Sequence, residues 1–476
     1  MEWEIVMGLE VHTELSTKTK IFCNFSTQFG GEPNTHVCEI CSGMPGTLPL
    51  LNKKVVEYAV RTGTATNCDI TRYNKFDRKN YFYPDLPKAY QISQLYLPIC
   101  RNGYIEIPDS EGGLKKVRIH EIHMEEDAGK LIHDEWEDCT LVDFNRCGVP
   151  LLEIVSEPDL RSADEVIAYL ERLSAILQYV GASDCKMQEG SLRADVNLSV
   201  RKKGESEFGV RTEMKNMNSF KAIARAIEYE SARQIELLEE GGTVVQETRR
   251  WDDGKGVSVA MRSKEDAQDY KYFPEPDLPP IELSEEYIEK IKAEMPELPQ
   301  QKKERYMNEL GLPEYDTGII TGSIYLVRLF ERTVELTNSP KDSANWIMGD
   351  LMGLLNESQT LPENMSFRQD SLGEIINLVN SGKINRGTGK KVLEKVFTED
   401  VNPAEYIEKN NLAAVTDTAA IKAVIVEVIA ANEKSVNEYK GGKTQAFQYL
   451  IGQSMRALKG KAPAPEVQKI LHELLD

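Results

Sequence analysis

The sequence predicts an α+β fold, because long stretches of alternating polar and apolar residues are interspersed with helical segments. Residues 5–15 alternate with a period of two, and residues 191–201 alternate even more regularly. Residues 163–180 and 219–240 have the apolar spacing of helices. This mixed order, with long strands of antiparallel type, favours an α+β sheet over a doubly wound parallel sheet.

Two proline-rich segments separate regions with different sequence patterns. Residues 274–280, PEPDLPP, close the region that contains the strand patterns, and Pro296 and Pro299 precede a section with helical spacing. A second helical unit is expected from about residue 404 to the end. At roughly 100–200 residues per domain, a chain of this length suits about two to four domains. We therefore expect three domains, over residues 1–292, 293–403 and 404–476.

The composition, with 41% hydrophobic and 28% charged residues, is that of a globular protein with a sizeable core. The first residues, MEWE, are acidic and lack the basic and apolar regions of a signal peptide. No run of about 18 apolar residues predicts a membrane span. The eight cysteines are spread along the chain and are expected to be reduced thiols. These features predict a cytoplasmic protein without a membrane partner.

Basic residues are concentrated in two parts of an otherwise acidic chain. The net charge of the whole chain, -20, argues against a nucleic-acid partner, because phosphate contacts require Lys and Arg. Binding is local, however, so the distribution of the basic residues matters more than their sum. The first group, without any acidic residue, is Lys440, Lys443, Arg456, Lys459 and Lys461, with Phe447 and Tyr449 between them. The second group is Lys383, Arg386, Lys390 and Lys391. We interpret both groups as candidate phosphate contacts, and the alternative is a solvated helix face with a flexible loop.

Glu10 and His12 lie two residues apart and therefore project from the same face of the first predicted strand. One carboxylate and one imidazole so placed can bind a divalent cation, and the alternative is an ordinary strand with a polar solvent side. Residues 120–127, HEIHMEED, concentrate further acids, including Glu126, at a density that calls for neutralising cations. Glu153 lies within an apolar run, where an acid is usually buried and paired.

Two further predicted strands carry polar faces. The first offers Arg193, Asp195 and Asn197, and the second offers Glu213 and Lys215. Mg²⁺ prefers carboxylate and phosphate oxygens, and Arg or Lys suits a polyphosphate. Together the strands predict an acidic cup with basic residues inside, which is suited to activation of a substrate by ATP and Mg²⁺.

Residues 75–94, KFDRKNYFYPDLPKAYQISQ, combine five aromatic side chains with basic residues that include Lys79. Such a segment could stack on the terminal adenosine of a tRNA or hold a triphosphate, and the alternative is a packed connecting loop.

Several common motifs are absent from the sequence. Residues 437–444, NEYKGGKT, end like a phosphate-binding loop, but Asn437 stands where the first glycine is required. No Gly-x-Gly-x-x-Gly motif follows a strand, and no Gly-x-Ser-x-Gly motif is present. We therefore expect ATP to bind without a P-loop, and the chain shows no nucleophile of its own for releasing ammonia from glutamine.

Cys23, Cys38 and Cys41 form a candidate zinc site. A Cys-x2-Cys pair with a distant third cysteine is a fair zinc signal. Because a tetrahedral structural site needs four ligands, the nearby His36 is a candidate for the fourth. The alternative is three reduced thiols in a loop.

Several long strings of the sequence are distinctive. They are GLEVHTEL (8–15), FDRKNYFYPDLPKAYQISQ (76–94), HMEEDAGK (123–130), LLEIVSEPDLRS (151–162), EGSLRADVNLSVR (189–201), YFPEPDLPP (272–280), ELGLPEYD (309–316) and ANWIMGDL (344–351). In these strings the chain closely resembles the B-subunit family of bacterial aspartyl/glutamyl-tRNA amidotransferases. The resemblance spans essentially the whole chain, and strings of this length do not match by chance.

The resemblance implies one component of a three-subunit enzyme. A separate amidase, the A subunit, would hydrolyse glutamine, and a small C subunit would brace the other two. The chain itself would use ATP to phosphorylate the side-chain carboxylate of Glu on the glutamine tRNA, or of Asp on the asparagine tRNA. Ammonia from the amidase would then displace the phosphate.

The resemblance also implies a fold and a set of site residues. The expected fold is a glutamine-synthetase-like cradle, followed by a helical domain and a helical tail that bind tRNA. The expected ligands of Mg²⁺ are His12, Glu126 and Glu153, with Glu10 and Glu213 near a second cation. The other expected site residues are Lys79, for catalysis, and Arg193, Asp195, Asn197 and Lys215, for the cofactor.

One position departs from the family pattern. Many family members carry Cys-x-Cys at the start of the cysteine motif, whereas Phe25 occupies the second cysteine position here. Three cysteines therefore remain as candidate ligands of Zn²⁺.

Two other functions compete with this one. The same acidic cup could amidate a free amino acid, but a small substrate would not require the basic helical C-terminal third. The chain could instead be a tRNA-binding scaffold without chemistry, but an acidic cup repels RNA unless metal ions occupy it.

Overall fold

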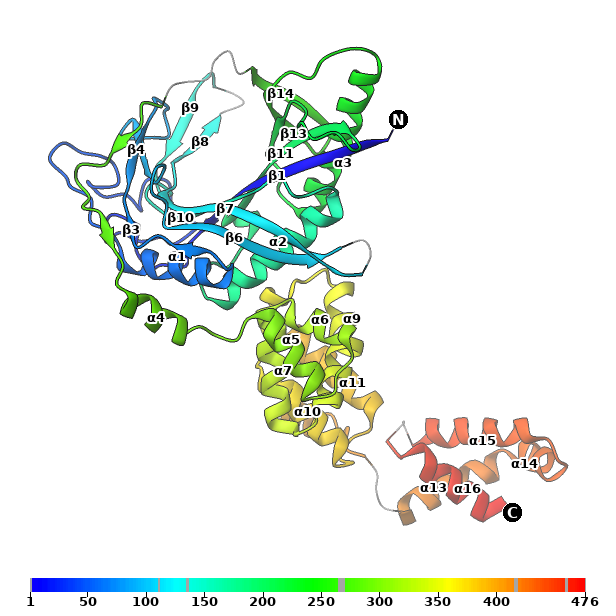
Figure 1. Cartoon of the computed structure of the whole chain (residues 1–476). Coiled ribbons are helices and arrows are strands. Elements are labelled where there is room, and N and C mark those ends of the chain that lie inside the picture. Colours follow the sequence, from blue (N-terminus) through cyan, green and yellow to red (C-terminus); the bar gives the residue numbers. More distant parts are fainter. Residues whose placement is uncertain are drawn as a thin grey trace. The chain divides into compact units, whose positions relative to one another are not determined.

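The computed structural model describes residues 2–109, 112–133, 137–263, 270–414, 418–458 and 461–475 (Figure 1). The chain divides into two compact units, Met1–Pro299 and Gln300–Asp476. The first unit combines a large sheet with helices, and the described part of the second unit contains helices and connecting turns. The predicted α+β fold followed by a helical region is thus confirmed. The further boundary near residue 404 stays a prediction.

A nine-stranded sheet forms the centre of the first unit, and its strands follow the order β14-β13-β12-β11-β1-β10-β7-β6-β2. The strands are β1 (Trp3–Glu14), β2 (Asp69–Ile70), β6 (Cys100–Pro108), β7 (Leu114–Glu126), β10 (Pro150–Ser156), β11 (Leu192–Lys202), β12 (Thr212–Lys215), β13 (Glu247–Asp252) and β14 (Val257–Ser263). Neighbouring strands are antiparallel except for β12 and β13, which run parallel. The first strand of the chain therefore lies in the middle of the sheet, between β10 and β11.

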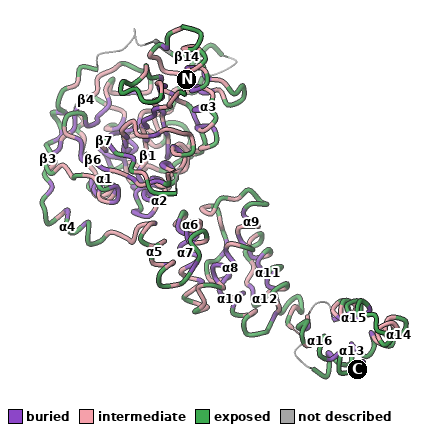
Figure 2. Tube along the Cα trace, turned by 45° about the vertical axis from the view of Figure 1, so that its right-hand side comes forward, coloured by how far each residue is buried: buried purple, intermediate pink, exposed green. Residues whose placement is uncertain are grey.

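Three helices cover one face of this sheet (Figure 1). They are α1 (Lys53–Ala65), α2 (Ala163–Tyr179) and α3 (Phe220–Glu239). Each begins at a side chain that accepts a backbone N–H of the first turn, namely Asn52, Ser162 or Ser219. The apolar sides of the helices share one core with Leu9 and Val11 of β1, and Figure 2 shows buried residues along the central strands. The helices therefore cover one face, and the polar residues of the strands point to the other.

Shorter elements surround the large sheet. They are β3 (Tyr73–Asn74), β4 (Asp77–Asn80), β5 (Tyr90–Ser93), β8 (Lys130–His133), β9 (Thr140–Asp143), η1 (Met187–Glu189), β15 (Phe273–Pro274), β16 (Ile281–Glu282) and α4 (Glu285–Ala293). The predicted basic and aromatic segment, residues 75–94, contains β4 and β5, which pair with each other. β15 pairs with the other edge of β4 and so brings residues 270–275 against this segment.

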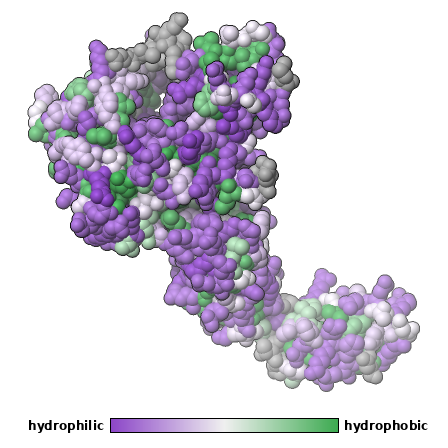
Figure 3. Space-filling model, in the orientation of Figure 1, coloured by the Kyte–Doolittle hydropathy of each residue, from purple (hydrophilic) through white to green (hydrophobic). Residues whose placement is uncertain are grey.

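The second unit is helical throughout its described length. Its elements are α5 (Pro299–Asn308), α6 (Glu314–Thr321), α7 (Ile324–Thr337), α8 (Pro340–Asn345), the π-helical turn η3 (Trp346–Leu351), α9 (Met352–Glu357), η4 (Pro362–Asn364), α10 (Asp370–Asn380), α11 (Arg386–Glu399), α12 (Pro403–Lys409), α13 (Thr418–Ala431), α14 (Glu433–Lys440), α15 (Thr444–Ala457) and α16 (Ala464–Leu475). The last four helices enclose a small core that includes Ile421, Leu450 and Ile470. The visible surface of the helices is mostly hydrophilic (Figure 3). Within the described ranges, no helix is long and apolar enough to cross a membrane.

A buried carboxylate joins α3 to three strands at one end of the sheet. Glu230 of α3 is fully buried and accepts hydrogen bonds from Thr212 of β12 at 3.0 Å and Ser258 of β14 at 2.9 Å. Arg233 and Arg249 lie 2.6 and 3.3 Å from the same carboxylate and supply positive charge. A buried charge of this kind is stable only while its partners remain in place.

We expect Glu230→Ala to lower the free energy of unfolding of the first unit by about 3–5 kcal/mol, because two arginines and two hydroxyl groups lose a buried acceptor. Urea denaturation followed by circular dichroism measures this change. Glu228, exposed on the same helix, provides the control, and Glu228→Ala should leave the midpoint nearly unchanged. Equal destabilisation by both substitutions would contradict a specific role for the Glu230 network.

Candidate active site

Four neighbouring strands align polar residues in one row on the face of the sheet opposite the helices. His12 of β1 pairs directly with Arg193 of β11 on one side and with Glu153 of β10 on the other. Glu153 in turn pairs with His123 of β7. Directly opposed residues of antiparallel strands share a face, so these four side chains lie next to one another. The row joins residues that are far apart in the sequence.

His12, Glu125 and Glu153 form a cluster around one point of this row. The Nε2 atom of His12 lies 3.4 Å from Oε2 of Glu153 and 3.7 Å from Oε1 of Glu125. One potential ligand atom from each of the three residues lies within 4.8 Å of the others. One imidazole nitrogen and two carboxylate oxygens at this spacing are suited to a divalent cation.

Electrostatics within the cluster favour charged carboxylates beside a positive group. Burial disfavours the charged form of His12, but the hydrogen bond and the charge of Glu153 outweigh burial and raise the pKa of the imidazole. Burial likewise opposes the ionised form of Glu153, yet the charge of His123 and hydrogen bonds from both imidazoles hold its pKa well below the usual value. His123 lies 2.8 Å from Glu153 through Nε2 and orients that carboxylate.

Glu126 does not join this cluster, although we expected it beside His12 and Glu153. Its carboxylate accepts hydrogen bonds from Lys88 at 2.7 Å and from the backbone N–H of Ile92 at 3.0 Å. Successive residues of a strand point to opposite faces, so Glu126 of β7 points away from the face that carries Glu125. Glu125 takes the expected place because it shares a face with His123.

A second acidic cluster lies on β1, β11 and β12. Ligand atoms of Glu10, Asp195 and Glu213 lie within 4.8 Å of one another. Lys215 is placed among them, with Nζ 2.8 Å from Glu213 and in contact with Asp195, and Asn197 donates to Glu10 at 2.9 Å. Burial, followed by the charge of Glu153, raises the pKa of Glu10. Five of the predicted residues are therefore brought together here.

Arg193 extends the row with positive charge. Its guanidinium donates to Asp127 at 2.7 Å, and burial of Arg193 is outweighed by the charge of Asp127, which raises the pKa of the guanidinium. Arg193 therefore stays charged beside His12 while Asp127 holds it in place.

Lys79 lies in the aromatic segment rather than in either acidic cluster. Its ammonium group lies 4.9 Å from the ring centre of Tyr270 and 5.7 Å from that of Tyr81. Burial raises the pKa of Tyr81 and of Tyr272, and nearby carboxylates that include Glu125 add to the effect. The aromatic segment therefore borders the first cluster. The sequence did not reveal this proximity, because residues 270–275 are distant in the chain from the other residues involved.

The three cysteines form a third cluster, as the motif predicted. Ligand atoms of Cys23, Cys38 and Cys41 lie within 4.8 Å of one another. A hydrogen bond from Cys23 lowers the pKa of Cys41. His36 is not part of the group, and its ring nitrogen Nδ1 lies 3.0 Å from the carbonyl oxygen of Gln28. The predicted fourth ligand is therefore not supplied by His36.

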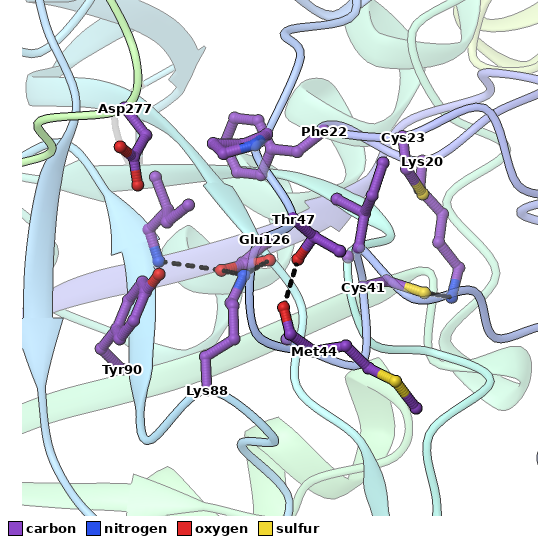
Figure 4. Close-up of a pocket in the computed structure, with 15 residues that line it drawn as sticks. Lys20, Phe22, Cys23, Cys41, Met44, Thr47, Lys88, Tyr90, Glu126 and Asp277 are labelled. Atoms are coloured by element: carbon purple, nitrogen blue, oxygen red, sulfur yellow. Dashed lines mark hydrogen bonds and ion pairs between the residues drawn. The ribbon is translucent and has the colours of Figure 1, made fainter.

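A cavity of about 140 Å³ lies beside the cysteine cluster. Cys23, Cys41 and Lys20 border it, and so do Lys88 and Glu126 (Figure 4). The ion pair of Lys88 and Glu126 thus faces the same space as two of the three thiols.

Comparison with known families gives two matches that together cover most of the chain. The family described as GatB/GatE catalytic domain matches residues 5–289, and the family described as GatB domain matches residues 328–475. The first match includes the sheet and the three clusters, and the second includes most of the helical unit.

Similar proteins match over nearly their whole length. A protein of Lachnoclostridium phytofermentans is 63% identical over 473 residues, which cover 99% of both chains. A protein of Lachnospira eligens is 58% identical, with 100% of this chain and 99% of the relative covered, and one of Thermoanaerobacter pseudethanolicus is 52% identical over 100% of both chains. Each of the three is named as the B subunit of aspartyl/glutamyl-tRNA(Asn/Gln) amidotransferase.

We expect Glu125→Gln to weaken binding of Mn²⁺, used in place of Mg²⁺, by more than about 10-fold, because the substitution removes a charged oxygen ligand. Glu126→Gln is the matched control in the neighbouring position, and it should leave the affinity within about 2-fold, since its side chain lies on the other face. Titration followed by electron paramagnetic resonance measures free Mn²⁺. Stronger loss in the Glu126 variant would refute this arrangement of ligands.

Proposed function

This chain belongs to the GatB family of amidotransferase B subunits, and on this premise we propose that it uses ATP to activate the side-chain carboxylate of glutamyl-tRNA(Gln) or aspartyl-tRNA(Asn) for amidation. Full-length identity of 52–63% to proteins named as B subunits supports the assignment of the chain to this part of the enzyme. The convergence of two acidic clusters on one open face of the sheet is the observation that carries the chemical proposal.

The proposed reaction has two steps because a carboxylate does not react with ammonia directly. A carboxylate oxygen first attacks the γ-phosphorus of ATP, the bond to ADP breaks, and an acyl phosphate forms. Ammonia then attacks the carbonyl carbon, the bond from carbon to the phosphate oxygen breaks, and inorganic phosphate leaves. The attacking nitrogen loses its extra proton to water or to a base, which leaves the amide.

The two clusters supply the ligands that such a reaction needs. His12, Glu125 and Glu153 would hold one Mg²⁺, and Glu10, Asp195 and Glu213 would hold a second. Bound Mg²⁺ neutralises the charge of the phosphoryl group during transfer. The donor sets fit, because the first offers two carboxylates and one imidazole and the second offers three carboxylates, all at close spacing.

The basic residues beside the clusters are assigned to the nucleotide. Arg193 and Lys215 keep their charge on the same face and would contact phosphate oxygens. Asn197 would orient Glu10, to which it already donates a hydrogen bond. Lys79, held between two tyrosine rings at the border of the first cluster, would approach the transferring group.

Two further proteins and the tRNA complete the proposed enzyme. Ammonia would come from an amidase, the A subunit, and a small C subunit would brace the assembly, in agreement with the B-subunit designation of the relatives. The helical unit would bind tRNA. Arg386 and Lys390 are half-exposed at the start of α11, and Asp350 of the π-helical turn holds both, at 3.0 and 2.6 Å. Cations that are held in place in this way are suited to contact the backbone phosphates of a tRNA.

The basic residues of the first predicted group differ in their partners. Lys443 pairs with Glu438 at 3.8 Å, and Lys461 donates to the backbone carbonyl of Asn411. Lys459 lies outside the described residues. In both basic groups, therefore, some of the cations already pair with groups of the chain.

Reconstitution with the amidase and the small third protein, in the presence of ATP, Mg²⁺ and glutamine, tests the proposal. We expect His12→Ala and Glu125→Gln to lower tRNA-dependent release of phosphate by at least about 100-fold, because each loses a ligand of the cation that stabilises the transferring phosphoryl group. Glutaminase activity of the amidase should persist. Glu106→Gln, on the exposed part of β6, is the control and should behave like the unmodified chain.

The same assay identifies the acceptor. Glutamyl-tRNA and aspartyl-tRNA are offered separately, and the amide formed on each is measured. ATP hydrolysis stimulated by free glutamate, without tRNA, would contradict the proposal and favour a free amino acid as the acceptor. Unchanged phosphate release in both cluster variants would refute the assigned residues.

A further inference from the structure

Among the described residues, η3 is the one π-helical turn of the helical unit. Helix α8, this turn and helix α9 follow one another without a break, and the residues at both junctions have right-handed helical backbone angles. π-helical turns are rare and often occur at functional sites. Two side chains of η3, Trp346 and Asp350, contact the first turns of α11, which is labelled in Figure 1.

The ring of Trp346 lies directly against α11. Trp346 is almost completely buried. A Cβ atom at Gly389 of α11 would lie 2.9 Å from Cη2 of this ring and 2.8 Å from Cγ2 of Val379, so the close approach requires a glycine. The guanidinium of Arg386 lies 4.6 Å from the centre of the same ring. The buried ring thus sets the distance between η3 and α11 and supports one cation of α11.

Asp350 binds two cations of α11 at once. One carboxylate oxygen lies 3.0 Å from Nη2 of Arg386, and the other lies 2.6 Å from Nζ of Lys390. The side chain of Asp350 is only 10% exposed, whereas those of Arg386 and Lys390 are 49% and 53% exposed. The acid is therefore covered, while both cations remain open to solvent.

Both cations keep hydrogen-bond donors that the described part of the chain does not use. A guanidinium has five N–H donors, and an ammonium group has three. Within the described ranges, Asp350 is the only acceptor for the side chain of Arg386, which it binds through Nη2, and the only acidic partner of Lys390. The remaining donors can bind a further anion without breaking the contacts to Asp350.

The spacing of the two cations suits a nucleic-acid strand. Arg386 and Lys390 are four residues apart, so they share one face of α11 and are separated by about 6 Å along its axis. Two cations placed in this way can each contact one of two neighbouring phosphates of a strand. The polyanion of the proposed function, a tRNA, presents such phosphates.

The negative charge of Asp350 opposes simple attraction of a polyanion. Two cations and one carboxylate leave the trio with a net charge of about +1 instead of +2, which weakens the long-range attraction for phosphates. Asp350 instead supplies fixed geometry. Lys and Arg lose much rotamer freedom when binding orders them, and a carboxylate that orders both side chains before the RNA arrives lowers this cost.

We propose that Asp350 is a positioning residue for tRNA binding. It holds Arg386 and Lys390 in place for two neighbouring phosphates of the tRNA backbone, so that a negative charge within a cationic site strengthens the binding of RNA. This inference rests on the proposed function, because it takes a tRNA as the polyanion that the helical unit binds.

Filter binding of a glutamine-tRNA transcript to the enzyme, reconstituted with the amidase and the small third protein, tests this role over a series of KCl concentrations. We expect Asp350→Asn to weaken binding by at least about 5-fold, although the chain gains positive charge, because both cations lose their support. Glu394→Gln is the matched control. It removes one negative charge from an exposed position of α11, and its Kd should stay within about 2-fold of the unmodified value or fall.

A double-mutant cycle tests whether Asp350 acts through the two cations. With Arg386 and Lys390 both replaced by Gln, Asp350→Asn should cause no further loss of affinity. The double replacement itself should lower the slope of log K against log [KCl] by about 1.4–1.8, because two phosphate contacts are lost. In the amidation assay, the effect of Asp350→Asn should appear in KM for the tRNA rather than in kcat, since η3 and α11 belong to the helical unit and not to the acidic clusters.

Circular dichroism verifies that each variant is folded. If Asp350→Asn does not fold, Asp350→Glu takes its place, because it keeps the charge and displaces the carboxylate by one methylene. It should weaken binding by at least about 2-fold.

The outcomes separate this proposal from the proposed function. An unchanged or tighter Kd for Asp350→Asn, as net charge alone predicts, would overturn the positioning role only. So would an equal loss of affinity from Asp350→Asn with and without the two cations, or a salt slope that their replacement does not change. An unmodified enzyme that does not bind the tRNA would also overturn the proposed binding of tRNA by the helical unit.

Discussion

The two-residue period of the central antiparallel strands is the constraint on which the site depends. In β1, Leu9 and Val11 are buried against the helices, while the intervening Glu10 and His12 reach the opposite face. β10 repeats the pattern, with Ile154 in the core beside Glu153 on the polar face. Because the core fixes the register of each strand, it also fixes which polar side chains meet across strands. The packing of apolar residues thus determines the geometry of the acidic clusters.

Negative charge on the polar face is balanced locally by residues of the chain. Glu153 lies between two imidazoles, those of His12 and His123, and Lys215 lies between Asp195 and Glu213. The positive partners make the dense acids compatible with a folded protein. A divalent cation bound at either cluster would take over part of this neutralising role.

The sequence alone predicted the parts of the site that depend on local alternation. The faces of residues 5–15 and 191–201 were assigned correctly, and Glu10, His12 and Asp195 lie on the polar faces of their strands; the register that sets Glu10 beside Asp195 came only from the structure. The choice between Glu125 and Glu126 could not be made from the sequence, because residues 120–127 carry acids on both faces. The pairing of β7 with β10, which sets His123 and hence the face of Glu125 beside Glu153, and the ion pair of Glu126 with Lys88 distinguish them. The contact of residues 270–275 with the aromatic segment could not be predicted from the sequence either, because it joins distant parts of the chain.

The central place of β1 has a consequence for how the protein is made. β1 ends at residue 14, but its two neighbours in the sheet begin only at residues 150 and 192. At translation rates of about 5–20 residues per second, roughly 7–28 s pass between the synthesis of the end of β1 and that of the end of β10. Throughout this interval the nascent N-terminal segment has neither of its native hydrogen-bonding partners. Its apolar face lacks its native neighbours for that time, and this segment would then be a binding site for chaperones that act on nascent chains.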